Sequence, residues 1–162
     1  MKQIDNALFD DLIAKAKNAP RKRAHFNLHP ELSDPVQRLC IAMEPGTYVR
    51  PHRHADPATW EVLIILRGSL ALNIFDDQGK VLERTVISAQ GPVRAIEIPQ
   101  SAWHAPASLE SGSVVFEIKQ GPYKQPAPGN FAPWAPEEGQ PEAARFLEWY
   151  RTAKPGDAPP KV

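Results

Sequence analysis

Three histidines and one glutamate in this chain have the residue types and spacing of a metal site. His52 and His54 are two residues apart, and Glu61 and His104 follow later in the chain. Side chains two apart on a β-strand point to the same side of the strand. A carboxylate and a third imidazole from other strands would complete four ligands for one divalent metal. The predicted metal ligands are therefore His52, His54, Glu61 and His104.

This ligand set suits several metals without selecting one. Three imidazoles and a carboxylate are compatible with Fe(II), Mn(II), Ni(II) or Zn(II). Six residues, 55–60, separate His54 from Glu61, and a solvated strand carboxylate is the alternative interpretation of Glu61. His25 and His29 lie outside the pattern, and we interpret them as polar surface or structural residues.

Two arginines are candidates for holding a ligand beside the metal. By strand parity Arg50 faces the same side as His52 and His54, and Arg67 faces the same side as Glu61. A guanidinium group holds a carboxylate or phosphate through paired hydrogen bonds. Arg50 and Arg67 are therefore the candidate substrate-binding residues, and the expected ligand is a small anion. The alternative is that both arginines lie at strand ends in solvent.

Short strands between two helices would position these residues. A helical stripe begins at Ile4, with Asp5 or Asn6 as its N-cap and Pro20 closing it, and a second stripe runs from Ala143 to Tyr150. Period-2 alternation predicts strands over 38–43, 48–54, 61–67, 69–75, 81–88, 94–98, 105–109 and 113–119. So many short strands without an intervening helix predict a mainly β protein, an antiparallel sandwich or jelly-roll barrel with a helix at each end.

The expected organisation is one domain with four segments. Residues 1–35 form an N-terminal helix and extended arm, and residues 36–120 form the barrel. Residues 121–152 form a proline-rich cover segment and the C-terminal helix, and 153–162 form a disordered tail. Within the cover segment, Phe131 and Trp134 are expected to cover an apolar face of the barrel, and a role in closing the pocket is the alternative.

Composition excludes several classes of function. The 162 residues carry a formal net charge of zero, so no global basic field favours nucleic acid or anionic lipid. No apolar run reaches the length of a membrane span, and no signal-peptide pattern opens the sequence. We therefore expect a cytoplasmic protein, which the single cysteine, Cys40, also fits. A homodimer that covers exposed edge strands is the expected assembly.

The spacing of these motifs resembles that of the cupin superfamily. Gly46 is followed by five residues and then His52, Glu61 is followed by six residues and then Gly68, and His104 ends the second motif that begins at Pro99. Ser101 stands where the superfamily typically has glycine. The resemblance implies a double-stranded β-helix, which is a jelly-roll barrel.

A wider set of segments is similar to the WbuC family of cupin-fold metalloproteins. These segments are 23–29, 34–39, 51–54, 60–63, 66–68, 116–118 and 131–139, and the similarity extends to about Tyr150. It implies a small metal-binding cupin, with some members associated with O-antigen and other surface-polysaccharide biosynthesis. The family's activity is not settled, so the similarity supplies no reaction.

Three classes of function fit the predicted site. The first is a metal-dependent isomerase, epimerase or lyase acting on a sugar or sugar-acid derivative, with the metal as Lewis acid. The second is an Fe(II)-dependent oxygenase, which requires a dry pocket. The third is a non-catalytic module that binds metal or sugar, favoured if the pocket holds no acid–base residue besides the ligands. The fold alone does not separate them, because cupins host many chemistries.

Overall fold

The computed structural model of the chain describes residues 1–55 and 57–161. Asp56, in the expected barrel, and Val162, at the end of the expected tail, lie outside the described residues. Two helices, eight strands and a short 3-10 helix follow one another in the described part. They are α1 (Asn6–Asn18), β1 (Arg23–Asn27), β2 (Val36–Met43), β3 (Glu61–Arg67), β4 (Ser69–Phe75), β5 (Val81–Ser88), β6 (Ala95–Ile98), β7 (Trp103–Ser108), β8 (Ser113–Gln120), η1 (Pro128–Asn130) and α2 (Ala143–Thr152).

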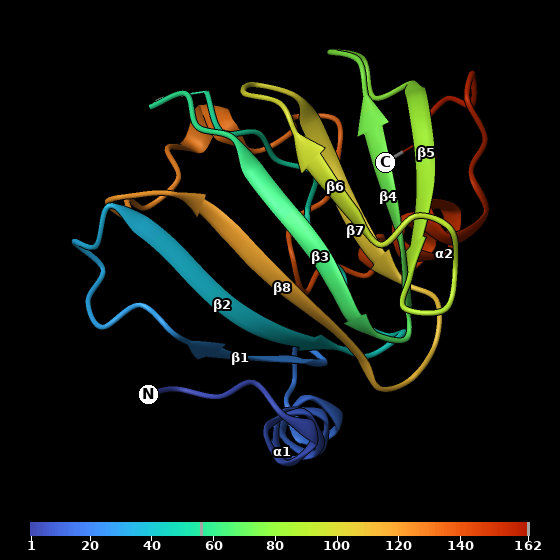
Figure 1. Cartoon of the computed structure of the whole chain (residues 1–162). Helices are drawn as coiled ribbons and strands as arrows, with labels where there is room; N and C mark the ends of the chain where they lie inside the picture. The colour runs from blue at the N-terminus through green and yellow to red at the C-terminus, as the bar shows by residue number, and fades with distance from the viewer. Residues whose placement is uncertain (56, 162) are drawn as a thin grey trace.

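Two antiparallel sheets form the body of the protein (Figure 1). The larger sheet has the strand order β1-β2-β8-β3-β6, and the smaller has the order β5-β4-β7. One face of each sheet contributes apolar side chains to a shared core, because successive side chains on a strand point to opposite faces. This core contains Met43, Leu63, Ile65, Leu70, Leu72, Ile87, Ile98 and Val115. The expected mainly β architecture of antiparallel sheets with a helix near each end is confirmed.

The helix α1 covers the outer face of the larger sheet. Asp5, one of the two predicted N-cap residues, caps it by accepting a hydrogen bond from the Leu8 N–H at 3.0 Å. Its buried residues Leu12 and Ala16 pack in one cluster with Cys40 and Ala42, the outward-facing residues of β2. The inward-facing residues of the same strand are thereby directed into the cavity described below.

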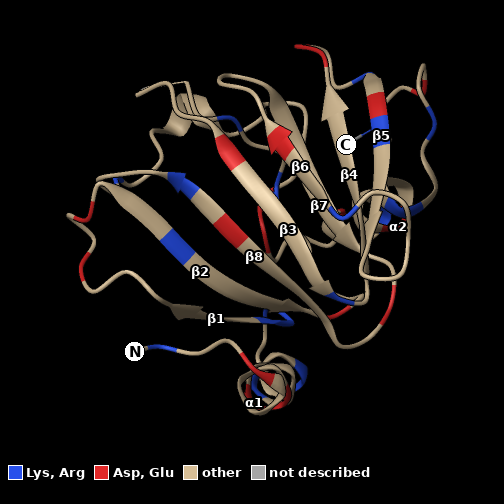
Figure 2. Cartoon of the chain, viewed as in Figure 1, with Lys and Arg blue, Asp and Glu red and all other residues tan. Residues whose placement is uncertain are grey.

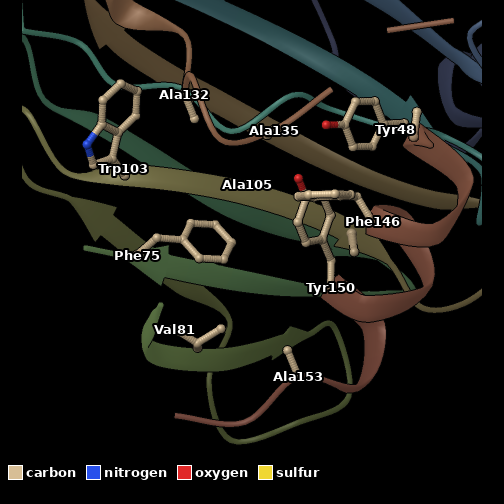
Figure 3. Packing of buried hydrophobic residues seen from close by; sticks show 12 residues of the cluster. Tyr48, Phe75, Val81, Trp103, Ala105, Ala132, Ala135, Phe146, Tyr150 and Ala153 are labelled. Atoms are coloured by element: carbon tan, nitrogen blue, oxygen red, sulfur yellow. The ribbon is translucent and has the colours of Figure 1, made fainter. Parts of the chain in front are cut away.

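The helix α2 covers the outer face of the smaller sheet, as Figure 3 shows. Phe146 and Tyr150 pack there with Phe75 of β4 and with Ala105 of β7. Trp134 from the cover segment packs against the same cluster, with its ring centroid 5.2 Å from that of Phe75. The apolar contacts fix the position of β7, which carries His104.

Most predicted strands form, but the segment over 48–54 does not become a regular strand. Pro51 interrupts it, and only His52 makes isolated β-bridges, to His104 and to Phe131. A strand that the sequence did not predict, β1, extends the larger sheet by pairing with β2. The end of the chain also differs from the expected disorder, since the Val81 N–H donates to the Asp157 carbonyl and the Gly156 N–H donates to the Val81 carbonyl.

Charged residues of both signs are interspersed along the elements (Figure 2). This arrangement agrees with the formal net charge of zero. Within the described part of the chain, no helix has the length and apolar character that crossing a bilayer requires.

The turn between β3 and β4 depends on a glycine. Gly68 has φ +73°, and a Cβ atom there would lie 2.5 Å from Ser113 Oγ and 2.9 Å from Ser113 Cα. The Ser113 hydroxyl in turn donates to the Ser69 carbonyl at 3.1 Å. A side chain at position 68 would therefore overlap Ser113 where the chain passes from one sheet to the other.

We expect Gly68→Ala to lower the free energy of unfolding by about 2–4 kcal/mol, measured by urea denaturation. About 1 kcal/mol comes from the left-handed backbone and the rest from the steric overlap. Gly139→Ala is the matched control, because Gly139 has φ +87° and a Cβ atom there would meet no atom of the described residues within 4 Å. Equal losses in the two variants would show that the contact with Ser113 has no energetic effect.

Candidate metal centre

The four predicted ligands lie together in the structure. One donor atom from each of His52, His54, Glu61 and His104 lies within 4.8 Å of the other three. Glu61 begins β3 and points inward with Leu63 and Ile65, while His104 points inward from β7. The cluster therefore joins residues from both sheets and from the connecting segment 48–54.

Backbone hydrogen bonds place His52 beside His104. The His52 N–H donates to the His104 carbonyl at 3.0 Å, and the His104 N–H donates to the His52 carbonyl at 2.9 Å. On its other side, the Arg53 N–H donates to the Asn130 carbonyl, and the Ala132 N–H donates to the Pro51 carbonyl. The segment is thus held between β7 and the cover segment although it forms no regular strand.

Two of the imidazoles are oriented for ligation by backbone carbonyls. His52 Nδ1 lies 3.1 Å from the Arg50 carbonyl, and His104 Nδ1 lies 2.9 Å from the Ala102 carbonyl. Each Nδ1–H donates to its carbonyl, which leaves the Nε2 lone pair free for a metal. His104 Nε2 is buried and has no hydrogen-bond partner among the described residues. An acceptor of this kind, aimed into the cluster, fits the coordination of a cation there.

Glu61 is a buried carboxylate and not a solvated one. Only 5% of its surface is exposed, and its Oε2 lies 2.8 Å from His54 Nε2 and 3.9 Å from His104 Nε2. Just before Glu61, the Thr59 N–H donates to the His54 carbonyl at 3.1 Å. Despite the longer spacing in sequence, the side chains of His54 and Glu61 lie in one cluster.

The charges of the cluster suit a bound cation. Burial, with the repulsion from His104, lowers the pKa of His52 to about 3. Burial also lowers the pKa of His104, so both rings stay neutral at pH 7. For Glu61, burial alone would raise the pKa, but the hydrogen bond from His54 and the nearby positive charges outweigh it and lower the pKa to about 2. Neutral imidazoles and an ionised carboxylate are the forms that bind metals.

A cavity of about 190 Å³ extends from the cluster into the barrel. Its apolar wall includes Leu63, Leu70 and Val115, and its polar wall includes Glu117 and Lys119 of β8 beside the metal ligands. Lys119 Nζ lies 2.8 Å from Glu117 Oε1. Figure 2 shows this acidic and basic pair along β8, beside the acidic start of β3.

Sequence reasoning did not identify Glu117 and Lys119. Strand parity places Val115, Glu117 and Lys119 on one face of β8, but parity does not say which face turns inward. Lys119 pairs with Glu61 in the register of β8 and β3, so Glu117 and Lys119 face the cavity. This register depends on contacts between segments that are distant in the sequence.

The structure does not bring the two candidate arginines to the cluster. Arg50 donates to the Ala132 carbonyl at 3.0 Å, lies 3.4 Å from Glu137, and stacks over Phe131. Arg67, at the opposite end of β3 from Glu61, pairs with Asp10 of α1 at 2.9 Å. Neither residue lines the cavity that contains the metal ligands.

Metal-free protein is expected to lose stability as the pH falls from 7 to 5. The pKa of His52 is about 3 when folded and near 6.5 when unfolded, so the unfolded chain takes up the proton first. The contribution of neutral His52 to the free energy of unfolding is complete above pH 6.5 and declines toward pH 3. At pH 5 it is smaller by about 1–2 kcal/mol. Urea unfolding with a chelator present measures this slope.

His52→Asn is the comparison variant, because an amide N–H can keep the hydrogen bond to the Arg50 carbonyl without titrating. Its stability should decline less steeply over the same pH range. Parallel slopes in the two proteins would contradict the assigned protonation state of His52.

Comparison with known proteins identifies the fold. No curated protein matches the chain. KdgF from Halomonas sp. is 17% identical with a TM-score of 0.50, covering 66% of this chain and 85% of that one. A cupin superfamily protein from Desulfitobacterium hafniense is 16% identical with a TM-score of 0.50, covering 67% and 86%.

A mutant of oxalate decarboxylase OxdC from Bacillus subtilis is 15% identical with a TM-score of 0.50. The match covers 68% of this chain and 28% of that longer protein. These structures show that the fold is a cupin fold. A family profile described as "Domain of unknown function (DUF6016)" matches residues 4–87, which is more than half of the sequence. The chain therefore belongs to the DUF6016 family.

Proposed function

We propose that this protein is a cytoplasmic metal-dependent enzyme that acts on a small anionic sugar derivative. The observation that carries the proposal is the pair of Glu117 and Lys119, which lies in the same cavity as three of the four ligands. A non-catalytic binding module does not require acid–base groups besides the ligands. Their presence favours an isomerase, epimerase or lyase over such a module.

His52, His54, Glu61 and His104 would hold one divalent transition metal, Fe, Mn, Ni or Zn. When bound, the metal supplies Lewis acidity and positive charge for the oxygen atoms of the ligand. A cation held there would bind the lone pair of His104 Nε2 and compensate the charge of Glu61. Carbonyl-bound Nδ1 atoms hold the rings of His52 and His104 in place.

The Glu117 carboxyl is suited to hold and release a proton. Burial raises its pKa, and the nearby charge of Glu61 raises it further. For Lys119, burial would lower the pKa, but the charges of Glu117 and Glu61 outweigh it and raise the pKa. Lys119 therefore stays cationic and can stabilise an oxyanion, while Glu117 Oε exchanges a proton with the substrate.

The anionic character of the substrate follows from the same groups. A cationic metal and Lys119 would face one cavity, and Arg23 also contributes to its lining. Oxalate decarboxylase, which shares the fold, is named for a small dicarboxylate, oxalate. The sugar part and a place in surface-polysaccharide metabolism rest on the resemblance to the WbuC family. We also propose that two copies of the chain form a homodimer through their exposed edge strands.

An Fe(II)-dependent oxygenase is the second candidate. The apolar wall formed by Leu63, Leu70 and Val115 favours it, because oxygenases need a cavity that excludes water. Oxygen uptake by the iron-loaded protein, measured with the same compounds used below, distinguishes this candidate from an isomerase, epimerase or lyase.

Removal of one imidazole tests the metal site. We expect His54→Ala and His104→Ala to lower metal affinity by about 100-fold or more, since each loses a direct ligand. Metal content after dialysis, measured by inductively coupled plasma mass spectrometry, should fall from one atom per chain to a small fraction. Circular dichroism should show that the sheets remain, because the core is apolar.

His25→Ala is the matched control, as His25 is an exposed histidine of β1 outside the cluster. It should keep one metal atom per chain. Full metal content in both His54→Ala and His104→Ala would contradict the assignment of the ligands.

Exchange of carbon-bound hydrogen tests the acid–base role. Metal-loaded protein in D₂O should exchange the hydrogen next to the carbonyl or carboxylate of a compound in a panel of sugar acids and keto sugars, followed by NMR. Glu117→Gln should slow the exchange by about 10²–10⁴-fold without changing metal content, because the amide cannot carry the proton.

Arg50→Ala is the control for this assay and tests the arginine candidate directly. Because its guanidinium is bound to Ala132 and lies near Glu137, we expect an unchanged exchange rate. Exchange that persists in Glu117→Gln, or no exchange from any compound in the panel, would contradict the role of Glu117.

A further inference from the structure

A second pocket lies on the same sheet face as the metal centre. Its volume is about 360 Å³, and its polar lining consists of His25, Asn27, His29, Gln37, Lys119 and Tyr123. Since His25 and Asn27 come from β1, we call it the β1 pocket. The proposed function uses none of these residues except Lys119.

Strand alternation shows that the β1 pocket and the metal cavity share one face of the larger sheet. On β1, Arg23 lines the metal cavity, while His25 and Asn27 line the β1 pocket. On β2, Ile41 and Met43 line the metal cavity, while Gln37 and Leu39 line the β1 pocket. Residues two apart on a strand share a face, so the two spaces follow each other along it.

Lys119 stands where the two spaces meet. It pairs in register with Gln37 of β2 on one side and with Glu61 of β3 on the other. Neighbouring strands are about 5 Å apart, so the row from Gln37 to Glu61 spans about 10 Å. Tyr123 and Lys119 also line the depression that contains His54. A ligand bound at the metal can therefore continue into the β1 pocket.

His29 adds an unused hydrogen-bond donor to this pocket. It is 5% exposed, and its Nδ1 lies 3.0 Å from both the Arg38 N–H and the Arg38 carbonyl. That carbonyl already accepts from the Leu28 N–H at 2.8 Å, so the Nδ1 atom is best used as the acceptor for the Arg38 N–H. The proton then resides on Nε2, which is buried and has no partner among the described residues.

The lining indicates which chemical group the pocket would take. Lys119 is the only Lys or Arg side chain among the residues that line it in the described structure, so a second strongly anionic group has no dedicated counter-charge. Amide, imidazole and phenol groups match hydroxyls, and the half-exposed ring of Tyr123 offers an apolar face. This combination suits a neutral, polyhydroxylated ring.

We propose that the β1 pocket is a sugar-binding subsite continuous with the metal cavity, so that the ligand is an acidic saccharide of at least two units. The acid end lies at the metal and Lys119, and the neutral sugar unit lies against His29, Asn27 and Tyr123. This inference rests on the proposed function, because it requires an acidic ligand at the metal centre.

Two probes that differ by one sugar unit test the subsite. Gluconate is a single sugar acid, and lactobionate is the same acid carrying a galactosyl unit. In calorimetric titration of the metal-loaded protein, lactobionate should bind at least about 10-fold more tightly than gluconate, which corresponds to about 1.4 kcal/mol. His29→Asn keeps an acceptor for the Arg38 N–H and removes the Nε2 donor. Tyr123→Ala removes the ring.

Both variants should reduce the preference for lactobionate to about 3-fold or less, with gluconate affinity and metal content unchanged. Phe26→Ala is the matched control, since Phe26 is a partly exposed aromatic residue of β1 whose strand position faces away from the pocket. It should keep the full preference.

The outcomes separate this inference from the proposed function. Equal affinities of the wild type for gluconate and lactobionate would overturn the subsite and leave the anion site standing. A preference that survives in both His29→Asn and Tyr123→Ala would also overturn it. Binding of neither probe would overturn the proposed anion site and the subsite with it.

Discussion

The buried carboxylate of Glu61 is the constraint on which the centre of this protein depends. A carboxylate that is 5% exposed at the edge of an apolar core needs compensating positive charge or strong hydrogen bonds. His54 supplies one hydrogen bond at 2.8 Å, and Lys119 lies opposite on β8. With His52 and His104 neutral, a divalent cation would complete the compensation. The same charge raises the pKa of Glu117, so the ligand set and the acid–base pair are electrostatically linked.

The packing of the two sheets places these groups with little freedom. Apolar clusters under α1 and α2 fix the outer faces of the sheets, and alternation then directs every second residue of β2, β3, β7 and β8 inward. The reciprocal hydrogen bonds between His52 and His104 connect the irregular segment to this frame. The site is therefore preorganised by backbone contacts, which is the arrangement that metal centres require for defined geometry.

Local patterns in the sequence were sufficient to predict the four side chains that cluster and most of the helices and strands. The apolar, β-branched run over 61–67 predicted β3, and the spacing of His52 and His54 predicted that both side chains point into one cluster, as they do. Features that depend on residues distant in the sequence could not be predicted from these local patterns. The inward face of Glu117 is set by the register of β8, and the bonds that hold Arg50 come from the cover segment. The strand β1 alternates polar inward and apolar outward residues, which resembles an exposed arm until β2 is placed beside it.

Anomalous diffraction from crystals grown with the native metal tests whether the four residues bind one ion. We expect one peak per chain, bonded at about 2.0–2.2 Å to imidazole nitrogens of His52, His54 and His104 and to a carboxylate oxygen of Glu61. Binding should separate Glu61 from its present hydrogen bond with His54. A metal found elsewhere, or an intact His54–Glu61 hydrogen bond in metal-saturated crystals, would contradict the assignment of these four residues as ligands.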